Sequence, residues 1–199
     1  NKQFKFLKKE NYDEIENGKT VLAGEIVDFV TDDSKSFLTI TVGSNLPFYN
    51  KQQLSLAGKY FNYEGVVFES KLPKNKLIEI AFKFLNTPYL WGGKSPFGID
   101  CSGFTQLVYK LGGYRLMRDA IEQATQGEVL SFIEESEPGD LAFFDNEEGS
   151  ITHVGIIMKD NYIIHAHGKV RIDRIDHTGI FNIDSQTHTH KLRVIKKII

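Results

Sequence analysis

The only cysteine of the chain, Cys101, lies in the stretch Tyr89-Leu90-Trp91-Gly92-Gly93-Lys94-Ser95-Pro96-Phe97-Gly98-Ile99-Asp100-Cys101-Ser102-Gly103. Behind it, apolar residues recur at the spacing of one helix face: Phe104, Leu107, Val108 and Leu111. Gly112-Gly113 predicts the end of this helix. A thiol in the first turn of a helix meets unpaired N–H groups and the positive end of the helix dipole, which favour the thiolate. A buried cysteine is more often an inert apolar residue, but this position makes Cys101 a candidate nucleophile.

The composition is that of an ordinary soluble protein. The 199 residues are 41% hydrophobic and 25% charged, with a formal net charge of −2. This balance gives no reason to expect nucleic acid or an anionic membrane surface as a partner, and no apolar run approaches the roughly 18 residues that span a bilayer. A single cysteine excludes an internal disulfide and a zinc site built from cysteines alone.

The sequence begins at Asn1 rather than at a methionine. We expect from this that an upstream segment has been removed. A signal peptide, a lipoprotein anchor and a cloning choice all remain open.

The first seventy residues are typical of a small β-domain. Strands are predicted over 24–30, 36–42 and 59–68, where β-branched and aromatic residues are separated by turn residues. Short strands at this spacing favour an antiparallel barrel. The polar stretch 70–75 is a candidate linker, so we predict two domains, 1–72 and 73–199.

The second domain is predicted to begin with helices and to continue with strands. A helix containing Leu77 and Leu85 ends before Pro88, the cysteine helix follows, and a shorter helix is expected over 118–126. After Pro138-Gly139 the pattern becomes strand-like, with strands expected over 140–145, 152–159, 162–167, 170–175 and 192–198. Helices followed by a run of strands indicate an α+β domain.

A nucleophilic cysteine needs a base, and two histidines of the strand region are candidates. His153 opens one expected strand and His165 lies in the next. On neighbouring antiparallel strands their rings can lie side by side. His153 would take the thiol proton, His165 would fix its tautomer, and we expect a thiolate–imidazolium pair. The spacing alone leaves this arrangement and purely structural roles equally open.

Five segments, in order, resemble the NlpC/P60 family of papain-like cell-wall cysteine peptidases. They extend over about 77–198 and are Thr87-Pro88-Tyr89-Leu90-Trp91-Gly92-Gly93, Phe97-Gly98-Ile99-Asp100-Cys101-Ser102-Gly103, Pro138-Gly139-Asp140-Leu141-Ala142-Phe143-Phe144, His153-Val154-Gly155-Ile156 and Ile164-His165-Ala166. The resemblance implies Cys101 as nucleophile, His153 as base and His165 as the third, polar member of the triad. His167 shares a strand face with His165 and stays an alternative for that role.

The resemblance also implies residues around the nucleophile. Tyr89 would lie near it and help an oxyanion form, and Trp91 would wall the cleft. Asp100 and Ser102 would meet the amino group and a carboxylate of a peptide, and Arg118 would border the cleft. Each has a plainer alternative: a packed aromatic side chain, a helix cap or a surface arginine.

The N-terminal domain resembles, more weakly, a bacterial SH3-like domain. The matching residues are Gly24-Glu25, Val27 and Tyr63-Glu64-Gly65-Val66-Val67. In the branch of the family that recycles murein peptides, such a domain helps to recognise an unsubstituted N-terminal L-Ala. Glu25 and Tyr63 are the candidates for that contribution, with packing and solubility as the alternative.

The resemblance implies a cysteine endopeptidase that hydrolyses the γ-D-glutamyl–diamino acid bond of peptidoglycan stem peptides or released murein tripeptides. No metal or organic cofactor is expected. The partner would be the peptide alone and the protein a monomer. The bacterial cell envelope or periplasm is the favoured location, with the cytoplasm left open.

Three alternatives remain. The domain could be a cell-wall binding module with an idle cysteine, or a thiol acyltransferase on the same fold. It could instead be a zinc site, for which Cys101, His153, His165 and one of His167, His188 or His190 offer ligands.

Overall fold

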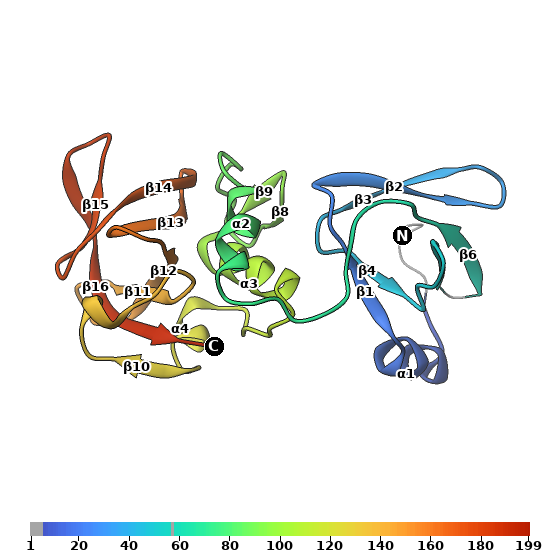
Figure 1. The fold of residues 1–199 in the computed structure, drawn as a ribbon, viewed down its shortest axis with the longest axis horizontal. Helices are drawn as coiled ribbons and strands as arrows, with labels where there is room; N and C mark the ends of the chain where they lie inside the picture. The colour runs from blue at the N-terminus through green and yellow to red at the C-terminus, as the bar shows by residue number, and fades with distance from the viewer. Residues whose placement is uncertain (1–5, 57) are drawn as a thin grey trace. The chain divides into compact units, whose positions relative to one another are not determined.

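The chain divides into two compact units in a computed structural model that describes residues 6–56 and 58–199 (Figure 1). The units are Asn1–Glu69 and Ser70–Ile199. The division falls at the start of the expected polar linker, slightly before the expected boundary at residue 72. Each unit is described by itself.

The N-terminal unit contains helix α1 (Lys9–Asn17) and short antiparallel strands. Three strands pair in the order β4-β1-β7 and four in the order β3-β2-β6-β5. Their bounds are β1 (Thr20–Ala23), β2 (Val27–Asp32), β3 (Phe37–Thr41), β4 (Asn45–Pro47), β5 (Gln53–Leu56), β6 (Lys59–Asn62) and β7 (Val67–Phe68). Helix α1 was not predicted from the sequence and has no buried residue.

Two expected strands of this unit differ from the structure. The strand expected over 24–30 begins only at Val27, in β2, because residues 24–26 connect β1 of one sheet to β2 of the other. At the break, the Gly24 N–H donates to the Val66 carbonyl at 2.7 Å. The strand expected over 59–68 divides into β6 and β7 for the same reason. Hydrophobic patterning does not show where a chain leaves one sheet for another.

The C-terminal unit begins with helices and continues with strands, as expected for an α+β domain. Helix α2 (Lys76–Phe82) precedes α3 (Cys101–Leu111), and α4 (Ala120–Gln123) is shorter than the helix expected over 118–126. The apolar face expected on the cysteine helix is buried, with Phe104, Leu107, Val108 and Leu111 each at most 3% exposed. Helix α3 ends before Gly112, and Gly113 takes a φ of 83°.

The strands form a seven-stranded antiparallel sheet in the order β10-β16-β11-β12-β13-β14-β15. Their bounds are β10 (Glu128–Leu130), β11 (Leu141–Asp145), β12 (Ile151–Ile157), β13 (Tyr162–His167), β14 (Lys169–Ile175), β15 (Gly179–Asn182) and β16 (Thr187–Lys197). A hairpin of β8 (Lys94–Ser95) and β9 (Gly98–Ile99) lies before α3, and the 3₁₀ turn η1 (Ile133–Glu135) follows β10. Helix α3 packs against β12 and β13, which brings the cysteine helix onto the histidine strands.

The two halves of strand β16 pair with different strands. Its first half, from Thr187, pairs with β15, and its second half, from Lys191, pairs with β11. Strand β16 therefore begins earlier than the expected start at residue 192, and β15 was not expected. The sheet closes through β16, and this closure brings His190 to the other histidines.

The turn between β12 and β13 sets the register of the two histidine strands. Asp160 and Asn161 both have a φ of 59°, as a type I′ hairpin turn requires. The Met158 N–H donates to the Tyr162 carbonyl at 2.8 Å. The hairpin expected at 159–161 forms without glycine because Asp and Asn tolerate this conformation.

Candidate active site

Cys101 is the first residue of α3 and is 7% exposed. The residue before it, Asp100, caps the helix: its carboxylate accepts from the Gly103 N–H at 2.6 Å. Backbone N–H groups of Val154, Ser102 and Cys101 itself point at the thiol. The contact with Val154 places the thiol beside β12, one residue from His153.

The loop before the cysteine is held on two sides. The Tyr89 N–H donates to the Gly168 carbonyl at 2.9 Å, and the Ile99 N–H donates to the Pro88 carbonyl at 3.0 Å. Gly92 takes a φ of 76°, and its N–H donates to Asp100 at 2.9 Å. These bonds connect the start of β14, the loop and the cap of α3, so Tyr89 is fixed beside Cys101.

His153 and His165 lie on neighbouring antiparallel strands, and their rings meet. Gly155 of β12 is opposite His165 of β13, so His153 lies diagonally across from His165 on the same face. His153 Nε2 is 2.8 Å from His165 Nδ1. A Cβ at Gly155 would lie 2.9 Å from the His165 Cβ, so the absence of a side chain there leaves room for the rings.

A buried carboxylate extends this chain of hydrogen bonds. His165 Nε2 is 3.0 Å from Asp173 Oδ2 on β14. Asp173 also accepts from Arg171 at 2.7 and 2.9 Å and from the Ile183 N–H at 3.0 Å. The pKa of Asp173 is lowered despite its burial, because His165, Arg171 and the Ile183 N–H all bond to it.

The carboxylate determines the tautomers of both rings. Ionised Asp173 can only accept, so His165 Nε2 carries the proton and His165 Nδ1 has the lone pair. His153 Nε2 must then donate to His165 Nδ1. His153 Nδ1 is left with a lone pair, which is what a base for the thiol requires.

Burial favours the neutral forms of both groups that would exchange the proton. It raises the pKa of the Cys101 thiol to about 11, although the backbone N–H groups oppose this. It holds the pKa of His153 well below its usual value, and the neighbouring His165, His190 and His167 lower it further. Burial therefore opposes the resting thiolate–imidazolium pair that the helix N-terminus favours, and that pair stays a prediction.

Asp100, Ser102 and Arg118 form one polar network beside the thiol. Arg118 donates to both carboxylate oxygens of Asp100, at 3.1 and 2.7 Å, and to Ser102 Oγ at 3.0 Å. Asp100 is thus both a helix cap and the partner of Arg118. The pKa of Asp100 is lowered, since these bonds outweigh its burial.

Two cavities flank the site. The first, of about 510 Å³, contains Cys101 in its wall together with Trp91 and the polar network just described. The second, of about 340 Å³, contains His153 in its wall together with His167 and His190. Tyr89 lines both. Trp91 is 85% exposed, so it is a cavity residue and not part of the core.

The two candidates of the N-terminal unit are placed differently. Tyr63 is 1% exposed, packs in the core of that unit, and its hydroxyl donates to the Val66 carbonyl at 3.3 Å. The structure therefore gives Tyr63 the packing role. Glu25 is partly exposed, and its suggested substrate contact stays a prediction.

Three further residues of the site were not expected in these roles. Asp173 and Arg171 are two apart on β14, with Arg171 directly opposite His165. A charged pair alternating along a strand beside the histidine strand is the signal that could have found them. From the sequence, His190 is a candidate only as a zinc ligand. In the structure its ring stacks on His153 with centroids 4.2 Å apart.

Three of the four ring nitrogens of His153 and His165, which were candidate zinc ligands, are engaged in hydrogen bonds. His153 and His165 share a hydrogen bond, and His165 also bonds Asp173. Within residues 6–56 and 58–199, no three or more histidine, cysteine or acidic side chains are arranged around a metal position.

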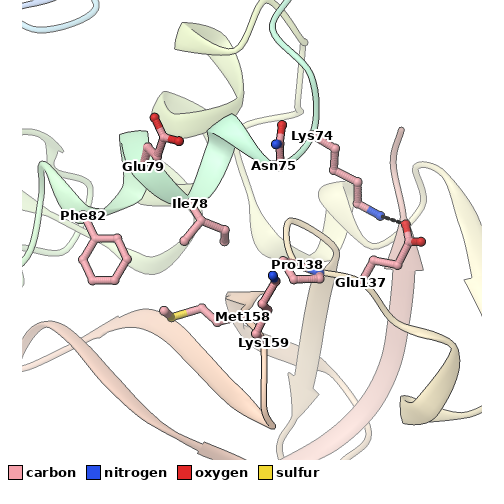
Figure 2. A pocket seen from close by; sticks show the side chains of 9 residues that line it. All are labelled: Lys74, Asn75, Ile78, Glu79, Phe82, Glu137, Pro138, Met158 and Lys159. Atoms are coloured by element: carbon pink, nitrogen blue, oxygen red, sulfur yellow. Dashed lines mark hydrogen bonds and ion pairs between the residues drawn. The ribbon is translucent and has the colours of Figure 1, made fainter.

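Another hollow of the C-terminal unit lies between α2 and the turn after β12 (Figure 2). Ile78, Phe82 and Met158 supply apolar side chains, and Lys74 is paired with Glu137 at 3.1 Å. It shares no lining residue with the two cavities of the site.

In the part of the chain that the structure describes, no helix has the length and apolar character to cross a bilayer.

The fold and site define a class of protein: an α+β domain with a cysteine at a helix start and an imidazole relay on the adjoining strands. The model of the NlpC/P60 family matches residues 86–189, which is more than half of the chain. The chain belongs to the NlpC/P60 family, a family of peptidoglycan hydrolases and peptidases.

Curated relatives match about half of the chain. The γ-D-glutamyl-L-lysine dipeptidyl-peptidase of Bacillus subtilis (strain 168) is 40% identical over 102 residues, covering 50% of this chain and 34% of the relative. The probable endopeptidase p60 of Listeria seeligeri is 39% identical over 104 residues, covering 52% of this chain and 20% of the relative. The chain thus spans about a third or less of the length of these relatives.

Solved structures share the fold. An NlpC/P60 family protein from Bacillus cereus ATCC 10987 has a TM-score of 0.78 at 24% identity, covering 96% of this chain and 66% of its own. The NlpC/P60 domain of the peptidoglycan hydrolase SagA has a TM-score of 0.51 at 26% identity, covering 63% of this chain and 99% of its own. The first comparison concerns the fold alone.

Proposed function

We propose that this protein is a cysteine endopeptidase that hydrolyses the γ-D-glutamyl–diamino acid bond of peptidoglycan stem peptides, with a free N-terminal L-Ala on its preferred substrate. The observation that carries the proposal is the relay from Asp173 through His165 to His153, which leaves a lone pair on His153 Nδ1. His153 directly precedes Val154, whose N–H contacts the Cys101 thiol. The relative from Bacillus subtilis, named for a γ-D-glutamyl-L-lysine peptidase activity, supports the choice of bond.

Acylation uses the neutral pair. As Cys101 Sγ attacks the γ-carbonyl carbon, its proton moves to His153 Nδ1. The Cys101 N–H and the Tyr89 hydroxyl are the donors proposed for the oxyanion. The imidazolium then gives its proton to the leaving amine, and the C–N bond breaks to leave a thioester.

Deacylation returns the protein to its starting state. A water molecule attacks the thioester while His153 Nδ1 takes one of its protons. The C–S bond breaks, the γ-carboxylic acid leaves, and the proton returns to the thiolate. His165 and Asp173 hold the His153 ring in orientation and stabilise its positive charge during both steps.

The first cavity suits the acyl half of such a substrate. That half carries an ammonium group on L-Ala and the free α-carboxylate of D-Glu. Asp100 and Arg118 offer one charge of each sign, and Ser102 offers a hydroxyl.

The N-terminal unit is proposed to be an SH3-like domain, and its two small antiparallel sheets support this proposal.

The test is mass spectrometry of the products from L-Ala-γ-D-Glu-diaminopimelate, with N-blocked and sugar-bearing versions and Cys101→Ala as control. Release of L-Ala-D-Glu from the free tripeptide alone supports the proposal. Cleavage of all three would replace it with a wall hydrolase that needs no free N-terminus. No cleavage by the wild-type protein would favour a binding module, and ligation products would favour an acyltransferase.

A further inference from the structure

Two histidines beside the catalytic relay have no part in the mechanism above. His190 of β16 stacks on the ring of His153, with centroids 4.2 Å apart and an interplanar angle of 29°. His167 of β13 meets His190 edge to face, with centroids 4.9 Å apart. His190 Nδ1 lies 2.8 Å from Thr189 Oγ1, which holds the ring in place.

Both histidines line the second cavity, on the His153 side of the site. The two cavities divide the catalytic pair: Cys101 is in the wall of the first, and His153 is in the wall of the second. Because His153 protonates the leaving amine, the leaving half of the substrate must lie on its side. The first cavity, with Asp100 and Arg118, is then left for the acyl half.

The lining of the second cavity determines which chemistry it accepts. It comprises Tyr89, Thr152, His153, Ala166, His167, Gly168 and His190, with no carboxylate among them. An ammonium group would find no counter-ion there. A carboxylate would find imidazole N–H donors and no like charge. A volume of about 340 Å³ lies at the lower end of the range for small-ligand sites, which is roughly 300–1,000 Å³.

We propose that His167 and His190 form the subsite for the leaving half of the substrate and bind the free carboxylate of its terminal diamino acid. This inference rests on the proposed function and adds a preference to it. The protein would favour peptides that end at the diamino acid over peptides in which that carboxylate is amidated or extended.

The experiment compares L-Ala-γ-D-Glu-L-Lys with its C-terminal carboxamide, which differs only in the group assigned to the subsite. The ratio of the two kcat/KM values is measured for each protein. Loss of a charge-assisted hydrogen bond predicts a preference of about ten-fold or more for the free acid in the wild-type protein. In His167→Gln and in His190→Gln we expect this ratio to fall toward one, mainly through KM for the free acid.

Using the ratio separates recognition from catalysis. His190 also touches His153, so its variant will lose activity on both substrates, but a general loss cancels in the ratio. His167 is exposed, so its substitution puts the fold at less risk. The matched control is His188→Gln on the same strand, whose Nε2 lies 3.0 Å from Asp176 Oδ2 and which lines neither cavity. Its ratio should equal that of the wild-type protein.

The outcomes are distinguishable. A wild-type ratio near one overturns the subsite while the proposed function stands. A high ratio that survives in both variants also overturns it, because the carboxylate is then recognised elsewhere. If the wild-type protein cleaves neither peptide, the proposed function fails, and the subsite fails with it.

Discussion

Replacing Asp173 by Asn tests the reasoning about the histidine tautomers. The carboxylate accepts from His165 at 3.0 Å, twice from Arg171 and once from the Ile183 N–H. An amide has one accepting oxygen and one donating nitrogen. Arg171 Nη2 and the Ile183 N–H both donate to Oδ1 and attract the amide oxygen there, so the NH₂ group takes the place of Oδ2, facing His165 Nε2 and Arg171 Nε.

The substitution should therefore reverse the relay. His165 Nε2 would accept, His165 Nδ1 would donate to His153 Nε2, and His153 Nδ1 would carry a proton where the thiol needs an acceptor. Loss of a general base costs about 10²- to 10⁴-fold. We expect kcat/KM to fall by that factor, equivalent to about 3–5 kcal/mol at 1.36 kcal/mol per tenfold change.

The assay is kcat/KM on the free tripeptide, with ¹⁵N NMR of the histidine rings to report the tautomers and thermal unfolding to report stability. Removing one partner of a buried ion pair destabilises by about 3–5 kcal/mol, and the Arg171 bond to Asp184 at 2.9 Å should keep the loss near the lower end. Asp184→Asn is the matched control, since Asp184 is 78% exposed and its loss should change activity little. A folded Asp173→Asn protein with at least half of the wild-type kcat/KM would refute the tautomer argument.

Three further outcomes are expected. Alkylation of Cys101 by iodoacetamide should be slow at pH 7 and should accelerate toward pH 11, because burial raises the pKa of the thiol to about 11. A rate that reaches its plateau at neutral pH would instead indicate a thiolate–imidazolium pair. The free energy of unfolding should fall below pH 6.5, because burial lowers the pKa of His190 to about 4 in the folded protein and the unfolded chain takes up the proton first. At 1.36 kcal/mol per pKa unit, the loss reaches at most about 3 kcal/mol. Chemical denaturation at pH 7 and pH 4.5 measures it, and equal free energies of unfolding at the two pH values would contradict the prediction. Gly155→Ala should lower kcat about ten-fold or more with little change in KM, because the new Cβ would lie 2.9 Å from the Cβ of His165 and displace that residue. Unchanged steady-state kinetics would contradict this prediction.

Local patterns in the sequence predicted the helix and strands that carry the candidate site. The apolar face from Phe104 to Leu111 predicted α3, and Gly112-Gly113 predicted its end; both are confirmed. The strands that carry His153 and His165 were also expected, with bounds close to those observed. These features depend on residues that are close together in the sequence, so they can be predicted without knowing the rest of the fold.

Other features depended on contacts between distant segments. Asp173 completes the relay because β14 pairs with β13 in one register, and His190 reaches His153 because β16 closes the sheet. The protonation states followed the same rule: helix position favoured a thiolate, but burial by the sheet raised the pKa of Cys101. Propensity and periodicity are local, whereas register, closure and desolvation are set by the whole domain. In this protein they bring Asp173 to His165 and raise the pKa of Cys101.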